Sequence, residues 1–164
     1  MEPFVQAALL AIPLYAANGS PVIIRGRRPI DFGRLAPDGR RVFGDGKTWE
    51  GLAGGIAVGT VAGWAASLLE PAYMSFAMAL LLSCGALLGD LLAAFAKRRA
   101  GMKRGDPAFP LDQLDFVIGG LVLATLFGYN ISLLAVISLL LVTPAIHVVA
   151  NLLAYLLKLK SVPW

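Results

Sequence analysis

The feature that most constrains this chain is a stretch without formally charged side chains, residues 116–157. A helix rises about 1.5 Å per residue and the hydrocarbon core of a bilayer is about 30 Å thick, so about 20 apolar residues make one crossing. The stretch is about twice that length, and Gly128 and Asn130 give a turn signal inside it. We therefore expect two helices here, one starting near residue 111 and the next at residue 131.

Three further uncharged runs precede this stretch, at residues 3–24, 51–69 and 71–89, and the last continues through Asp90 toward Lys97. Each run is long enough to cross a membrane. Hydrophobic residues make up 58% of the chain and charged residues only 15%, and the mean hydropathy of +0.75 is far above that of soluble domains. The sequence predicts an all-α integral membrane protein with five transmembrane helices.

Glycines spaced by four residues mark two of these runs. Gly55, Gly59 and Gly63 lie in one run, and Gly85 and Gly89 lie in the next. Small residues at this spacing let a neighbouring helix approach closely. We expect them to pack helices within the chain, and a homodimer formed through the same faces is an open alternative.

Lysine and arginine are confined to three segments between or after the expected apolar runs. Seven lie within residues 25–47, five within 97–104, and two are Lys158 and Lys160. Because positively charged loops stay on the cytoplasmic side, we expect the N-terminus outside, the C-terminus in the cytoplasm, and two polar cytoplasmic loops in a multi-pass protein of the cell membrane. No linker interrupts this pattern, so residues 1–164 are expected to form a single domain.

The net charge and its position along the chain indicate which kinds of molecule the protein binds. The formal net charge is +4, but the basic residues lie in short loops beside the membrane, which favours anionic headgroups and phosphorylated substrates over nucleic acid. The single cysteine, Cys84, has no partner for a disulfide or a thiolate metal site.

Three carboxylates stand at the edges of the expected helices. Asp112 and Asp115 are three residues apart after Pro110, so they share one face of the first turn of a helix. Asp90 follows an uncharged run, where a charged side chain is costly. Oxygen ligands from two neighbouring helices suit one or two Mg²⁺ ions that also bind substrate phosphates. The alternative for Asp112 and Asp115 is a structural role at a helix N-terminus.

Basic side chains follow Asp90 along the same expected helix. Lys97 lies seven residues, about two turns, after Asp90 and so shares its face, and Arg98 extends the positive surface. Cations beside carboxylates suit a triphosphate bridged to metal. Lys103 and Arg104 could also help there, although contact with lipid headgroups is the first expectation for them.

The loop before the second run contains Gly44, Lys47 and Thr48. Its Gly-Lys-Thr order invites a P-loop interpretation, but the first glycine of that motif would fall at Arg41, and no strand precedes the loop. The local chemistry remains, because glycine permits close backbone approach and donors at a helix N-terminus favour anions. The sequence therefore predicts a phosphate-binding loop here without a P-loop fold.

Three polar residues lie inside the apolar runs. Asn18, near Pro21, could contact a base or ribose or could satisfy carbonyls that the proline leaves free. His147 and Asn151 are four residues apart and share one helix face. For this pair we expect a hydrogen-bonded helix contact outside the site.

Three elements follow one another in the second half of the chain: Gly89-Asp90, Lys97-Arg98 and Asp112-Gln113-Leu114-Asp115. In this order they resemble the C-terminal signature of the CDP-diacylglycerol synthases, in which a Gly-Asp, a basic pair and an Asp-Arg-x-Asp element occur. Gln113 stands where the bacterial enzymes usually have arginine, and residues 106–110 replace their Gly-His-Gly-Gly segment. In these departures, in its small size and in its Gly-Lys-Thr loop, the chain resembles the archaeal branch of the family, the CDP-archaeol synthases. The resemblance covers nearly the whole chain.

The resemblance implies transfer of a cytidylyl group from CTP to 2,3-bis-O-geranylgeranylglycerol 1-phosphate, an isoprenoid ether phospholipid precursor, forming CDP-archaeol and pyrophosphate. It implies Mg²⁺ as cofactor, held by Asp90, Asp112 and Asp115, which would be catalytic together with Lys97. It implies nucleotide contacts from Asn18, Gly44, Lys47, Thr48, Lys97 and Arg98.

Two other functions compete with this one. An ion or small-molecule transporter would line its path with Asp90 and the basic residues, but the charges gather at one expected membrane face. A CDP-alcohol phosphotransferase would complete an Asp-Gly-x-x-Ala-Arg element, whereas here Asp38 and Gly39 are followed by residues 40–43, which read Arg-Arg-Val-Phe.

Overall fold

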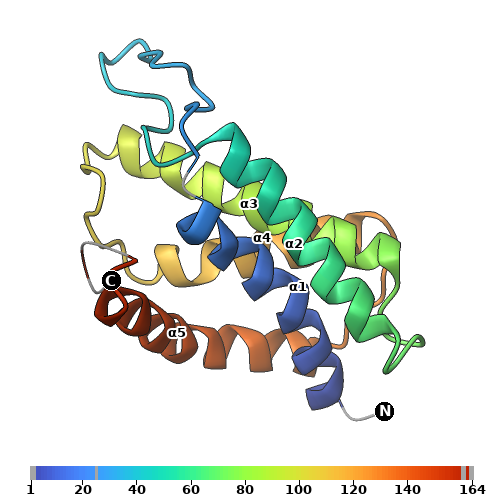
Figure 1. Ribbon diagram of the computed structural model, residues 1–164. Coiled ribbons are helices and arrows are strands. Elements are labelled where there is room, and N and C mark those ends of the chain that lie inside the picture. The colour runs from blue at the N-terminus through green and yellow to red at the C-terminus, as the bar shows by residue number, and fades with distance from the viewer. Residues whose placement is uncertain (1–2, 25, 160–161, 163–164) are drawn as a thin grey trace.

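The computed structural model describes residues 3–24, 26–159 and 162, and this part of the chain contains helices and no strand. Figure 1 shows the helices: α1 (Pro3–Ile24), α2 (Trp49–Ser67), α3 (Phe76–Arg99), α4 (Leu111–Leu126) and α5 (Leu133–Leu156). The predicted all-α class and the number and order of the helices are confirmed for the described residues.

Capping side chains decide where two of the helices begin. The hydroxyl of Thr48 accepts a hydrogen bond from the Gly51 amide at 3.1 Å, so α2 starts just before the predicted run. The hydroxyl of Ser75 accepts one from the Met78 amide at 3.1 Å. Because of this cap, α3 begins later than residue 71, where the uncharged run begins.

Three helices, α1, α3 and α5, are long and apolar enough to cross a membrane, with mean hydropathies of 1.6, 2.0 and 2.4. Helix α4 has 16 residues, fewer than the roughly 20 that a crossing normally takes. These helices define a membrane protein, whereas five crossings and their orientation stay predictions. Arg25 and Lys160, which contributed to the predicted orientation, lie outside the described residues.

Helices α3 and α4 form the most extensive helix contact in the chain. A Cβ at Gly85 would meet the carbonyl oxygen of Gly119, and a Cβ at Gly89 would meet that of Asp115. The absence of side chains at these glycines therefore lets the two backbones touch. This contact places Asp90, on α3, next to the first turn of α4.

The glycines of α2 serve the same purpose. Positions 55, 59 and 63 face α1 and α3, where added Cβ atoms would collide with Ala17, Pro13 and Ala79. The predicted helix packing is confirmed, and this face of α2 is used inside the chain.

The loop between α1 and α2 is fastened to the end of α3. Arg99 pairs with Asp38 at 2.5 Å, and Arg40 donates to the Arg99 carbonyl at 2.6 Å. Figure 1 shows this loop, residues 26–48, standing beyond the end of the bundle where α3 ends. The same end carries the connection between α3 and α4, because Arg40 also lies against Gly101.

Candidate active site

A cavity of about 760 Å³ lies at this end of the bundle, and all five helices contribute to its wall. The predicted residues that line it are Asn18, Lys47, Thr48, Asp90, Lys97, Asp112 and Asp115. The other two predicted residues, Gly44 and Arg98, line a smaller cavity of about 170 Å³ that shares Lys47, Asp90 and Lys97 with the first. The structure thus brings together residues from both polar loops and from both halves of the chain.

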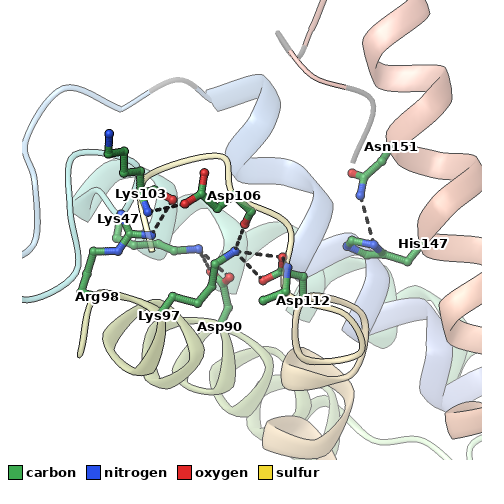
Figure 2. A network of polar contacts seen from close by, with 10 residues as sticks. Lys47, Asp90, Lys97, Arg98, Lys103, Asp106, Asp112, His147 and Asn151 are labelled. Carbon is green, nitrogen blue, oxygen red and sulfur yellow. Dashed lines mark hydrogen bonds and ion pairs between the residues drawn. The ribbon is translucent and has the colours of Figure 1, made fainter. Parts of the chain in front are cut away.

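Lys47 bridges the loop and helix α3. Its Nζ donates to both carboxylate oxygens of Asp90, at 2.5 Å each, and both side chains are about one-quarter exposed. Figure 2 shows this pair beside Lys97. The loop lysine that was expected to bind phosphate therefore lies against a carboxylate that was expected to bind metal.

Lys97 makes the corresponding contact with α4. Its Nζ donates to both oxygens of Asp112 at 2.9 Å and to the Asp106 carbonyl at 2.6 Å. Asp112 also accepts a hydrogen bond from the Ala108 amide at 2.9 Å, which fixes its orientation (Figure 2). Asp112 is therefore bonded to both Lys97 and the connection between α3 and α4.

Asp115 is the third predicted carboxylate. One of its oxygens accepts a hydrogen bond from the Phe116 amide at 2.6 Å, and among the described residues no ion pair involves it. It lies within electrostatic range of Asp90 and Asp112. In the described part of the chain no group of three His, Cys, Asp or Glu side chains is close enough to hold a metal as it stands.

Asp31 organises the backbone of the loop before α2 and was not singled out from the sequence. Its buried carboxylate accepts hydrogen bonds from Arg41, from the Phe43 amide at 3.0 Å and from the Gly44 amide at 2.9 Å. Burial by itself raises the pKa of Asp31, but these hydrogen bonds and one from the Gly33 amide together hold the pKa well below its usual range. The Gly44 amide, expected to face a nucleotide, is thus bonded to Asp31.

Two arginines differ in what they contact. Arg98 donates to the Lys103 carbonyl at 3.0 Å, so it holds the connection between α3 and α4 in shape. Arg104 lines both cavities and lies close to Gly46, where an added Cβ would be 3.3 Å from its Nε. Arg104 therefore borders the site, and contact with lipid headgroups stays a prediction for it.

His147 and Asn151 on α5 also line the main cavity, although sequence reasoning left them out. The Asn151 side-chain nitrogen lies 3.0 Å from His147 Nδ1, and Figure 2 shows both residues projecting from α5 toward the side where Lys97 and Asp112 lie. The sequence signal that could have pointed to them is a pair of polar residues four positions apart in an apolar helix. The rotation of α5 about its axis, which aims them at the cavity, could not be obtained from the sequence.

The cavity combines acidic and basic groups at one end of an apolar bundle, which suits substrates that carry several phosphates. Fold and cavity together define a helical membrane protein with a charged cavity at one end of its bundle. The model of the CDP-archaeol synthase family matches residues 3–164, and the chain belongs to this family.

Individual relatives agree with this family over their full lengths. The chain is 48% identical to the CDP-archaeol synthase of Pyrococcus abyssi over 172 residues and 50% identical to that of Pyrobaculum arsenaticum over 167 residues, with 100% of each chain covered. A solved structure, described as an intramembrane enzyme for archaeal membrane lipids biosynthesis, is similar with a TM-score of 0.85 and 40% identity, covering 90% of this chain and 94% of that one. The transporter and phosphotransferase alternatives find no support in these relatives.

Proposed function

We propose that the chain forms CDP-archaeol by transferring a cytidylyl group from CTP to the phosphate of 2,3-bis-O-geranylgeranylglycerol 1-phosphate. The observation that carries this proposal is the pair of lysine–aspartate contacts, Lys47 with Asp90 and Lys97 with Asp112, which line one cavity. Family membership supplies the substrates.

The reaction needs little from the protein beyond placement. A phosphate oxygen of the lipid attacks the α-phosphorus of CTP, one phosphorus–oxygen bond forms, and the bond to the leaving pyrophosphate breaks. The attacking oxygen is already anionic at neutral pH, so no general base is required. Alignment of the two phosphates and stabilisation of the leaving group therefore account for catalysis.

The donor set of the cavity fits Mg²⁺. Asp90, Asp112 and Asp115 provide hard oxygen donors, and two lysines leave one carboxylate charge without a paired cation. These carboxylates would hold Mg²⁺, which when bound would supply positive charge that neutralises the phosphates. Asp112 is already oriented by the Ala108 amide, and Asp115 by its own helix turn.

Lys47 and Lys97 have a double role in this proposal. Each balances a carboxylate while the cavity holds no substrate, and each then turns to phosphate oxygens when CTP is bound. Lys47 comes from the loop before α2, whose backbone is held by the contacts of Asp31 with Arg41 and the Phe43 amide. Its backbone is therefore set, while its long side chain can reorient. Asn18 and Thr48 line the same wall, and Thr48 also caps α2.

We further propose five membrane crossings in one domain, with the cavity at the cytoplasmic face. All positively charged residues of the described chain that approach the cavity come from the loop before α2, the end of α3 and the connection that follows it. CTP would then enter from water, and the isoprenoid chains would stay in the bilayer. A homodimer stays a prediction, and its interface would lie away from the buried glycine face of α2.

Replacing the carboxylates tests the proposal. Asp90→Asn and Asp112→Asn should each lower CTP-dependent CDP-lipid formation by about a hundredfold or more, because charge stabilisation at the phosphates is lost. The assay follows radiolabelled CTP with the ether-linked lipid phosphate, and thermal unfolding in detergent verifies that each variant folds. Glu70→Gln, which changes a carboxylate in the turn between α2 and α3, is the matched control. Wild-type turnover in either aspartate variant would remove that residue from the site.

A further inference from the structure

We infer that His147 and Asn151 form the subsite that holds the acceptor phosphate of the lipid, and this rests on the proposed function. The pair lines the main cavity from α5, the helix that contributes no charged side chain to it. The ionic groups of the cavity come instead from α3, from α4, from the connection between them and from the loop before α2. The cavity therefore has a charged wall and a polar, uncharged wall.

The hydrogen bond within the pair constrains the chemistry of the imidazole. The side-chain nitrogen of Asn151 lies 3.0 Å from His147 Nδ1; because an amide nitrogen only donates, this contact is compatible with a ring proton on Nε2. The ring also lies against Phe116, with centroids 6.2 Å apart, and Phe116 is fully buried. Asn151 and Phe116 together hold the imidazole in place at the cavity wall.

A neutral donor suits an acceptor that must act as a nucleophile. A lysine would stabilise the negative charge of the attacking phosphate oxygen strongly and so reduce its reactivity. A hydrogen bond from Nε2 positions the phosphate while leaving most of that charge in place. The lysines of the opposite wall are better placed for the triphosphate, whose charge increases on the leaving group.

The surroundings of the pair match a lipid rather than a second nucleotide. Thr143, bonded to Tyr15 at 2.8 Å, is the last buried residue of α5 among those described. Beyond it Val148, Val149 and Leu153 are each more than half exposed, as expected for side chains in contact with bilayer lipid. Isoprenoid chains lying along this part of α5 would bring their phosphate to His147.

The test separates acceptor binding from nucleotide binding in the purified protein. His147→Phe keeps an aromatic ring against Phe116 and removes the donor, and His147→Gln restores a donor of similar reach. For His147→Phe we expect the KM for the lipid phosphate to rise about 10-fold to 100-fold. The KM for CTP and the melting temperature should stay at wild-type values, and His147→Gln should recover most of the loss. Val61→Ala, which changes an exposed valine of α2 that lines neither cavity, is the matched control.

A second measurement addresses the phosphate itself. The same isoprenoid glycerol without its phosphate should inhibit wild type and His147→Phe equally, because the chains bind elsewhere. An unchanged KM for the lipid phosphate in His147→Phe, or equal losses for CTP and lipid, would overturn the inference. Absence of CDP-lipid formation by the wild-type protein would instead contradict the proposed function, so the two failures are distinguishable.

Discussion

Lys47 reaches Asp90 from a loop that lies 43 positions earlier in the chain, and this single contact joins the two parts of the site. The sequence indicates a role for each of the two residues by itself. A lysine after glycines suggests phosphate binding, and an aspartate after an apolar run suggests a functional charge. Their pairing could not be predicted, because it depends on how the loop folds over α3. The buried carboxylate of Asp31, which shapes that loop, carries no local sequence signal at all.

At the same scale, Asp31 makes the loop sensitive to acid. Its folded-state pKa is held below the usual range, so its contribution to stability is complete above about pH 4, the usual value for aspartate, and is lost as the pH falls below it. Asp31→Asn should lower the melting temperature at pH 7 by roughly 3–8 °C. The difference from wild type should shrink between about pH 4 and pH 3. Thermal unfolding of both proteins at a series of pH values measures this difference in melting temperature.

The matched control for this titration is Asp38→Asn. Asp38 belongs to the same loop but its carboxylate is more exposed, so its removal should lower the melting temperature less than the change at Asp31. A constant difference between wild type and Asp31→Asn down to pH 3 would show that this carboxylate does not titrate with folding.

At the scale of elements, the contact between α3 and α4 sets the spacing of the carboxylates. Gly89→Ala would press a methyl group against the carbonyl of Asp115 and push the two helices apart. We expect a loss of about 1–3 kcal/mol in stability, and a larger loss of activity than this destabilisation alone would cause. Gly19→Ala on α1, where an added Cβ meets nothing within 4 Å, is the control and should behave as wild type. Thermal unfolding and the CTP assay on the same preparations provide the comparison.

The helices themselves were largely predictable, for a simple physical reason. An uncharged run flanked by charges has few alternatives to a helix in lipid, and α1 coincides with its predicted run. The starts of α2 and α3 differ from prediction because Thr48 and Ser75 cap them, and hydrophobicity does not report capping. The orientation of His147 toward the cavity could not be predicted, because a helix that is apolar on all sides shows no clear hydrophobic periodicity.

At the scale of the whole molecule, the ends of the five helices alternate between two ends of the bundle. The last turns of α1 and α3, the second half of α5 and the first turns of α2 and α4 all reach the cavity. A chain that crosses a membrane with each helix would produce this arrangement, with the site at one face. The basic residues near that end favour the cytoplasmic face.

This topology can be tested with single cysteines in a Cys84→Ser background. Lys103→Cys lies in the connection between α3 and α4, and Asn130→Cys lies in the exposed turn between α4 and α5. With a membrane-impermeant maleimide, we expect position 103 to be labelled only in inside-out vesicles and position 130 only in right-side-out vesicles or cells. Labelling after detergent addition controls for reactivity at each site. If both positions react from the same side, α4 does not cross the membrane, and its 16 residues would then form a helix embedded at one face.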